Sequence, residues 1–303
     1  MNRVLNFHYV YDHEWFEEII CFLKSKYELI SAETLLDFHE GHIHIKNTCH
    51  ITIDDGEKSF HSVMFPILKK YNVPATLFIS PKIINENVNY WFQEILEFDQ
   101  IILKKIIADV LKVSVDRVRK FNANLLLKTL PIQQILDIIR NYQITTQTSA
   151  TTSQNMTVEN LLEVDQSGLI AIGAHTLNHP ILANEDDICS FNEISGSINE
   201  LSNLLNHEVR YFAYPNGKPY LDFTEREMNY LRNCGIKLAF AIEPKNTSMG
   251  DNMMSIPRIA ISSNESIYFT RAKLHLGNFG YPLKKFKPKG EYQKRKRLNR
   301  ILN

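Results

Sequence analysis

The chain has 303 residues, of which 44% are hydrophobic and 22% charged, as is typical of a globular protein with a sizeable core. Lys and Arg together number 34, as do Asp and Glu, so the formal net charge is zero and we expect no nucleic-acid partner. No run approaches the roughly 18 apolar residues of a membrane-crossing helix, and the first residues contain too short an apolar run for a secretory signal. A cytoplasmic location is therefore expected.

Seven short runs rich in branched or aromatic residues predict strands. They cover residues 3–9, 49–54, 75–79, 169–174, 209–214, 237–242 and 256–262. Stretches with helical periodicity separate most of them, which favours a parallel sheet with right-handed crossovers. Because no dinucleotide-binding glycine pattern is present, we expect a distorted (β/α) barrel of about seven parallel strands. An open doubly wound sheet is the alternative.

One segment, at about residues 93–165, is too long for a simple crossover. It contains helical patterns at 95–112 and 131–142, then a polar stretch and a further helix that Gly168 ends. We therefore predict a single barrel domain over residues 1–283 that carries a helical insertion at about 93–165.

The last segment, residues 284–303, is predicted to be a basic tail. Between Lys284 and Arg300 it has nine Lys or Arg and a single acid, Glu291. Pro288 and Gly290 interrupt this run, so we expect a solvated terminus instead of a packed element. The alternative is a specific contact with an acidic glycan, with nucleic acid, or with anionic lipid at the inner face of the membrane.

Two adjacent acids follow the strand at 49–54. Adjacent strand residues point to opposite faces, so Asp54 and Asp55 reach one pocket only if the chain leaves the pleat, and Gly56 permits that turn. A solvated turn is the alternative. Glycosidase chemistry is disfavoured, because its two carboxylates flank the bond from several ångströms apart.

Two histidines follow the strand at 169–174. Pro180 disfavours a helix at His179, so we expect His175 and His179 on a tight turn. Because the carboxyl ends of parallel strands meet at one edge, these imidazoles and the acid pair are expected to converge. One carboxylate and two imidazoles are a usual shell for catalytic zinc, which leaves the second carboxylate as a base. The alternative is one core and one surface histidine.

The strand at 209–214 runs into a Pro-x-Gly turn at Pro215–Gly217. Such a turn can present backbone N–H groups to a developing oxyanion. An ordinary β-turn is the alternative.

These residues resemble the polysaccharide deacetylase family, also called the NodB homology domain or carbohydrate esterase family four. The segment 53–56 resembles its first motif, TFDDG, and the segment 175–179 resembles its second motif, H-[ST]-x-x-H. The resemblance implies that Asp54 is the catalytic base. It also implies that Asp55, His175 and His179 hold one divalent metal ion, with zinc favoured.

The segment 212–217 resembles the third motif, which implies that the N–H of Asn216 stabilises the oxyanion. The Arg and Tyr that this motif often carries are replaced by Ala213 and Asn216. A similar departure marks the exopolysaccharide deacetylases whose last motif is permuted to the N-terminus. The segment 5–10 resembles that permuted motif and makes His8 the candidate general acid. Arg258 resembles a late Pro-Arg strand and is a candidate for orienting a carboxylate, with an ordinary ion pair as the alternative.

The resemblance covers roughly residues 3–262 and implies a distorted seven-stranded barrel. It implies hydrolysis of an N-acetyl group on an amino sugar of a glycan or of a lipid-linked surface-polysaccharide precursor. Trp91 and Tyr214 are candidates for contact with the substrate, and Trp91 could stack on a sugar face, as could Tyr90, Phe92 and Tyr220. Packing in the core or at the rim is the alternative for these aromatic rings. Two alternatives stay open: a carbohydrate-binding protein with impaired catalysis, and a metal-dependent hydrolase of another amide or an ester. The sequence predicts no oligomeric state.

Overall fold

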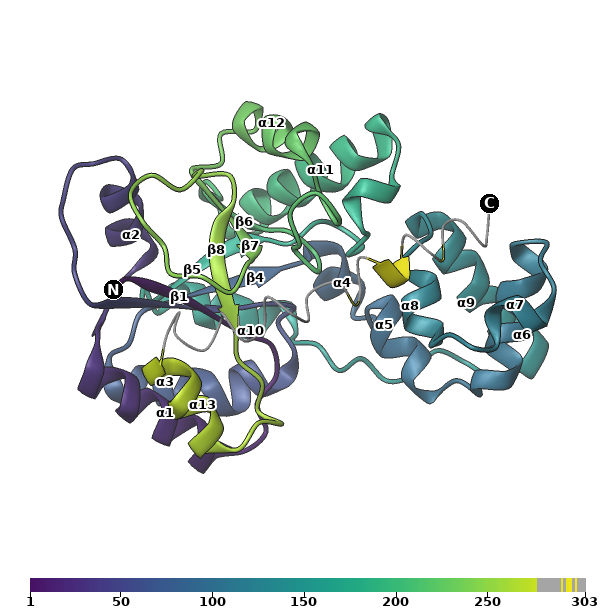
Figure 1. The fold of residues 1–303 in the computed structure, drawn as a ribbon, viewed down its shortest axis with the longest axis horizontal. Helices are drawn as coiled ribbons and strands as arrows, with labels where there is room; N and C mark the ends of the chain where they lie inside the picture. The colour runs from purple at the N-terminus through teal and green to yellow at the C-terminus, as the bar shows by residue number, and fades with distance from the viewer. Residues whose placement is uncertain (277–289, 291–292, 296–297, 299–303) are drawn as a thin grey trace.

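The computed structural model describes residues 1–276, 290, 293–295 and 298, and its central feature is a closed barrel of seven parallel strands (Figure 1). The strands are β1 (Arg3–Phe7), β3 (Thr48–Ile53), β4 (Ala75–Ile79), β5 (Ile170–Ala174), β6 (Tyr211–Ala213), β7 (Leu238–Ile242) and β8 (Ile256–Ala260). β1 pairs with β3 on one side and with β8 on the other, which closes the barrel. The predicted barrel is therefore confirmed, and the open sheet is excluded.

One further strand was not expected. β2 (Glu28–Leu29) pairs in parallel with the start of β3. Two residues are too few to show a period of two in the sequence.

Helices surround the barrel, as the alternation predicts. They are α1 (His13–Lys26), α2 (Ala32–His39), η1 (Phe60–Met64), α3 (Phe65–Tyr71), α4 (Pro81–Glu86), α10 (Val158–Gln166), η3 (Leu182–Asn184), α11 (Asp187–Leu205), α12 (Glu225–Asn233) and α13 (Ile267–Leu276). Local signals set several starts: the side chains of Asp12, Thr157 and Thr224 accept hydrogen bonds from the first turns of α1, α10 and α12.

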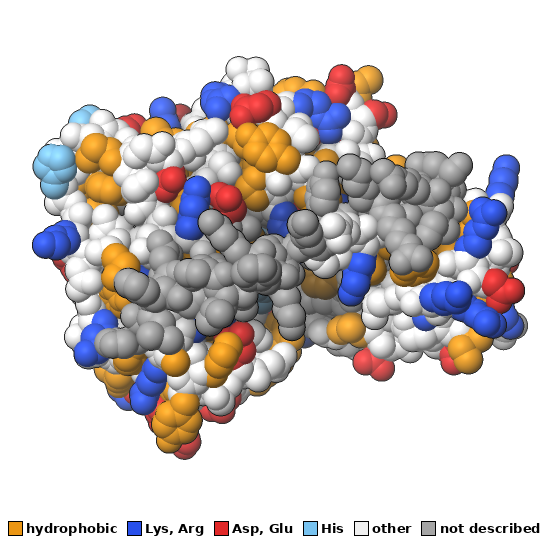
Figure 2. All heavy atoms as spheres, viewed as in Figure 1, with side chains coloured by type: hydrophobic (Ala, Val, Ile, Leu, Met, Phe, Trp, Pro, Cys, Tyr) orange, Lys and Arg blue, Asp and Glu red, His pale blue; other side chains and the backbone are white. Residues whose placement is uncertain are grey.

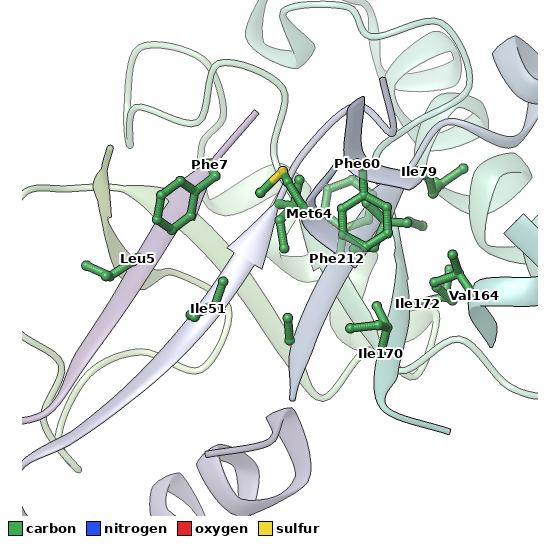
Figure 3. Close-up of a cluster of buried hydrophobic side chains, with 14 of the residues drawn as sticks. Leu5, Phe7, Ile51, Phe60, Met64, Ile79, Val164, Ile170, Ile172 and Phe212 are labelled. Carbon is green, nitrogen blue, oxygen red and sulfur yellow. The ribbon is translucent and has the colours of Figure 1, made fainter. Parts of the chain in front are cut away.

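Side chains of the barrel strands alternate between two faces. Leu5 and Ile51 face outward and are buried under the surrounding helices in the main core (Figure 3). Val4, Phe78 and Phe240 belong instead to a second cluster on the inward face, which α2 also joins. Burial of one such side chain stabilises the fold by roughly 1.5–3 kcal/mol.

The inward face becomes polar towards the carboxyl ends of the strands. Asn6, His50, Thr52 and Arg258 are each 0% exposed. Because every second residue of a strand points to the same face, Asp54 follows Thr52 into this space. The polar end of the barrel thus positions the candidate site.

The predicted helical insertion is present as a lobe beside the barrel (Figure 1). It consists of α5 (Trp91–Glu94), η2 (Ile95–Glu97), α6 (Gln100–Val110), α7 (Val115–Val118), α8 (Ala123–Leu127) and α9 (Ile132–Thr146). Its apolar side chains form their own cluster, in which Leu103, Leu126 and Ile138 are fully buried. On the face shown in Figure 2, Lys and Arg side chains gather at the outer edge of this lobe.

The helix that follows the insertion, α10, lies outside this cluster. Leu161 and Val164 of α10 pack into the main core of the barrel. α10 is therefore part of the barrel, and the lobe is shorter than the predicted insertion at 93–165.

Part of the basic segment is buried, against expectation. Residues 293–295 are helical, Arg295 is 3% exposed and forms an ion pair with Asp222, and Leu298 packs into the cluster of the insertion. The prediction of a solvated tail is therefore wrong at Arg295 and Leu298. Gly290, Gln293 and Lys294 are exposed, as predicted. The remaining residues of 284–303 lie outside the described residues, and the predicted membrane contact stays a prediction. Within the described part of the chain, no helix is both long and apolar enough to cross a bilayer.

Candidate metal centre and active site

The turn after β3 brings two adjacent carboxylates to the same end of the barrel. The N–H of Asp54 still donates to the Phe7 carbonyl at 3.0 Å, so this residue continues the strand. Asp55 and Gly56 then adopt left-handed φ angles of 73° and 66°. A Cβ at Gly56 would lie 2.3 Å from Cδ1 of Ile79, so any other residue would have to displace that side chain and also adopt the left-handed φ, which favours glycine here. The departure from the pleat that the sequence predicts is thus present.

The two histidines lie on a strained turn after β5. Thr176 and His179 have φ angles of 64° and 56°, which non-glycine residues seldom adopt. The buried carboxylate of Glu193 on α11 accepts the N–H groups of Leu177 and Asn178, both at 2.9 Å. Strained residues that the surrounding structure holds in place often mark functional sites.

Asp55, His175 and His179 converge on one point. Oδ1 of Asp55 lies 3.5 Å from Nε2 of His175 and 3.6 Å from Nε2 of His179, and all three side chains are buried. Among the described residues, this carboxylate oxygen has no hydrogen-bond partner. Nδ1 of His175 donates to the Ala213 carbonyl at 2.7 Å, which leaves its Nε2 as a lone-pair donor. A buried oxygen without a partner between two imidazole nitrogens fits one divalent cation.

The pKa values in this cluster favour an ionised Asp55 and a neutral His179, which are the forms that can bind a metal ion. Burial raises the pKa of Asp55, but the neighbouring histidines lower it more, so it lies well below its usual value. Burial lowers the pKa of His179 to about 3, which leaves this imidazole neutral. Burial also lowers the pKa of His175, but the charges of Asp55 and Asp54 raise it more, so it lies above its usual value. Metal binding would displace that proton.

Arg258, the candidate for orienting a carboxylate, contacts Asp54. The Arg258 guanidinium donates two hydrogen bonds to it, at 2.7 Å to Oδ1 and 2.9 Å to Oδ2. Asn6 donates to Oδ2 at 3.1 Å. Burial raises the pKa of Asp54, but Arg258 and the charge of His175 lower it more. Asp54 is therefore an ionised carboxylate in a fixed orientation, which agrees with an orienting role for Arg258.

His8 lies at the same edge of the barrel. It follows Phe7, the last residue of β1, and its side chain is exposed. Phe7 pairs with Ile53 of β3, and its carbonyl accepts the N–H of Asp54 at 3.0 Å, so His8 leaves β1 beside the acid pair. The structure thus gathers His8 with the acid pair.

The third-motif turn carries Asn216 with a left-handed φ of 60°. Its side-chain amide donates to Asp222 at 2.6 Å, and its Oδ1 accepts from Nζ of Lys128 at 2.7 Å. Lys128 belongs to the insertion, and its charge also helps to lower the pKa of His179. Sequence reasoning missed this lysine, because 88 residues separate it from Asn216.

The two aromatic candidates are not open to a ligand. Tyr214 is 1% exposed, and its ring stacks on Phe223 with centroids 3.5 Å apart. The prediction that Tyr214 binds the substrate is therefore wrong. Trp91 is 3% exposed, and its Nε1 donates to the His179 carbonyl at 2.9 Å. It positions the histidine turn and offers no free ring face.

Two further side chains fix the site and were not expected. The hydroxyl of Tyr90 donates to the Asp55 carbonyl at 2.9 Å, and that of Ser80 donates to the His175 carbonyl at 2.9 Å. Ser80 directly follows β4, so its place after a strand was a usable signal.

Comparisons with known proteins identify a family and a shared fold. The sequence model of the family described as polysaccharide deacetylase matches residues 43–114 and 129–239, which is more than half of the chain. The match leaves out residues 115–128, where α7, α8 and Lys128 lie. A search of curated proteins found no match.

Solved structures share the fold. IcaB from Ammonifex degensii is 19% identical with a TM-score of 0.60, covering 89% of this chain and 95% of that one. The Streptococcus pyogenes deacetylase PplD is 18% identical with a TM-score of 0.59, covering 90% and 97%. A de-N-acetylase from Aggregatibacter actinomycetemcomitans is 17% identical with a TM-score of 0.59, covering 89% and 98%. At these identities, the likeness establishes the barrel architecture.

Proposed function

The chain belongs to the polysaccharide deacetylase family, and from this premise we propose that it is a metal-dependent hydrolase that removes N-acetyl groups from amino sugars. The substrate we propose is a glycan or a lipid-linked precursor of a surface polysaccharide. One observation carries the proposal: the unpartnered Oδ1 of Asp55 lies between Nε2 of His175 and Nε2 of His179. These three residues would hold one divalent ion, with zinc our first choice.

When bound, the ion would polarise the acetyl carbonyl and make the attacking water more acidic. Asp54 would accept the proton of that water. A carboxylate has about four acceptor positions, of which Arg258 and Asn6 occupy three. One position therefore remains for the water, and the low pKa of Asp54 keeps it ionised at neutral pH. Positioned proton transfer of this kind contributes roughly 10²–10⁴-fold to rate.

Two further groups complete the proposed reaction. The N–H of Asn216 would donate to the oxyanion, a contribution of about 10²–10³ in rate. His8, at the rim of the site, would deliver a proton to the departing amine. Cleavage of the amide then yields acetate and a free amino sugar.

A pair of substitutions tests the roles of base and ligand. Asp54→Asn should keep the metal and lose turnover by about 10²–10⁴-fold, whereas His175→Ala should lose both. Metal content by mass spectrometry and acetate release from N-acetylglucosamine oligosaccharides measure the two properties. Full activity in Asp54→Asn would contradict the assignment of the base.

Stability must be measured in the same variants. Asp54 and Arg258 form a buried ion pair, and removal of one partner costs about 3–5 kcal/mol. The thermal unfolding of each variant is therefore measured alongside each assay. Asp116→Asn and His13→Ala are matched controls, since their side chains are 80% and 58% exposed; both should behave as the unaltered protein.

The same assays separate the competing functions. Oligosaccharide binding without acetate release would favour a binding protein with impaired catalysis. Faster acetate release from acetyl esters than from acetamides would favour another hydrolase. We also propose a cytoplasmic location, which cell fractionation tests.

A further inference from the structure

Two exposed tyrosines follow the candidate acid. Tyr9 is 46% and Tyr11 is 66% exposed. Their ring centroids lie 5.8 Å apart at an interplanar angle of 39°. Single exposed aromatic residues are common, but a contacting pair directly after His8 presents a continuous apolar surface at the rim of the site.

Hydrogen bonds hold this pair in place. The hydroxyl of Tyr11 donates to Oε1 of Glu57 at 2.9 Å, and Oε2 of Glu57 accepts the N–H of Ser59 at 2.8 Å. On the other side, the hydroxyl of Ser263 donates to the Tyr9 carbonyl at 3.2 Å. The loop after β1 is therefore tied to the loops after β3 and β8. A surface that is already ordered loses little conformational entropy when a ligand binds.

A groove opens beside Tyr9. It has a volume of about 340 Å³, and its walls include His8, Tyr9 and the hydroxyl residues Ser262 and Ser263. In the barrel, β1 lies between β8 and β3. The groove therefore lies on the β8 side of His8, while the acid pair follows β3 on the other side.

The chemistry of the groove suits a neutral sugar. The C–H face of a sugar ring packs on aromatic faces, and its hydroxyl groups need hydrogen-bond partners. Glu265 and Lys273 also line the groove, but they form an ion pair at 3.2 Å, so their charges cancel. A neutral, hydroxyl-rich ligand is favoured over an anion.

We propose that Tyr9, Tyr11 and the adjoining groove form a subsite for a neutral sugar residue next to the sugar that is deacetylated. This inference rests on the proposed function, since it takes the glycan as the ligand. The enzyme would then prefer chains of several sugars over a single N-acetylated sugar, because only a chain reaches the subsite while its acetamide lies at the metal centre.

The test compares N-acetylglucosamine with its tetrasaccharides in β-1,4 and β-1,6 linkage. In Tyr9→Ala and Tyr11→Ala, the ratio of kcat/KM for the tetrasaccharide to that for the single sugar should fall about tenfold, mainly through KM. Tyr11→Phe keeps the ring and loses the hydrogen bond to Glu57. It should therefore lower this ratio less than Tyr11→Ala does. Phe191→Ala, a 41% exposed ring on α11, is the control and should leave the ratio unchanged.

The outcomes separate this inference from the proposed function. An unchanged ratio in both alanine variants, with an active unaltered enzyme, would overturn the subsite alone. Tetrasaccharide binding that the same variants weaken in calorimetry, without acetate release, would support the subsite and overturn the proposed function. An unaltered protein that neither binds nor deacetylates any of these sugars would overturn both.

Discussion

The barrel buries polar groups in its interior, whereas the insertion is built around apolar side chains. His50, Thr52 and Arg258 are fully enclosed in the barrel, and hydrogen bonds satisfy them. The cluster of the insertion holds residues such as Leu126 and Ile138. Buried polar networks impose one arrangement of their members, so the barrel fixes the reacting groups. An apolar helical cluster tolerates more sequence variation, and the family match leaves out part of the insertion.

The insertion nevertheless contacts both loops of the site. Trp91 donates to the His179 carbonyl, and Lys128 donates to Asn216. Farther along, Asn184 donates to the Lys128 carbonyl at 3.0 Å. The barrel therefore supplies the proposed reacting groups, and the insertion supports the loops that carry them.

Low pH should produce the largest difference between the two regions, because it should destabilise the barrel more than the insertion. Burial lowers the pKa of His50 to about 4 in the folded barrel, against about 6.5 in an unfolded chain. Its contribution to stability is therefore complete above pH 6.5 and is lost as the pH falls towards 4. The loss amounts to roughly 3 kcal/mol of unfolding free energy. The insertion has no histidine between residues 87 and 156, so it lacks this dependence.

The two tryptophans report the two regions separately. Trp15 lies on α1 beside the barrel, and Trp91 lies in the insertion. Urea unfolding at pH 4–7, followed in Trp91→Phe and Trp15→Phe, gives a transition for each region. His50→Asn should reduce the pH dependence reported by Trp15 without abolishing it, because burial also lowers the pKa of His179. Coincident transitions with the same pH slope would show that barrel and insertion unfold as one unit.

The same contrast explains what the sequence could reveal. The barrel strands are predictable because each is a short, mostly apolar run between helical periods. The acid pair and the two histidines are predictable because they directly follow such runs. Tyr214 was misassigned, although it lies two residues after the core residue Phe212 and so shares its face.

Contacts between the insertion and the barrel were not predictable. Trp91 and His179 are 88 residues apart, as are Lys128 and Asn216. Neither pair has a periodicity or spacing that links its members. Their proximity follows from how the lobe packs on the barrel, which depends on tertiary contacts across the whole chain.

Trp91→Phe tests whether the insertion supports the metal centre. The change keeps a ring in the cluster but removes the donor to the His179 carbonyl. Supporting contacts of this kind are worth about 10–100-fold in metal affinity, and we expect the lower end because the ligand itself remains. Zinc affinity from competition with a chelator measures the effect. Trp15→Phe is the matched control, since Trp15 donates to the Glu265 carbonyl instead; equal affinities in the two variants would argue against support by the insertion.

Lys128→Met tests the smaller contact, between the insertion and the third-motif turn. Methionine keeps the aliphatic stem and removes the bond from Nζ to Oδ1 of Asn216. Asn216 keeps its bond to Asp222, so we expect a loss of only about 1 kcal/mol, or roughly fivefold in kcat/KM. Metal content should not change, because no metal-binding residue loses a hydrogen bond and loss of a nearby positive charge does not disfavour a cation. Lys120→Met, an exposed lysine of the same lobe, should leave kcat/KM unaltered. If Lys128→Met also left kcat/KM unaltered, the insertion would support only the turn that carries the two histidines.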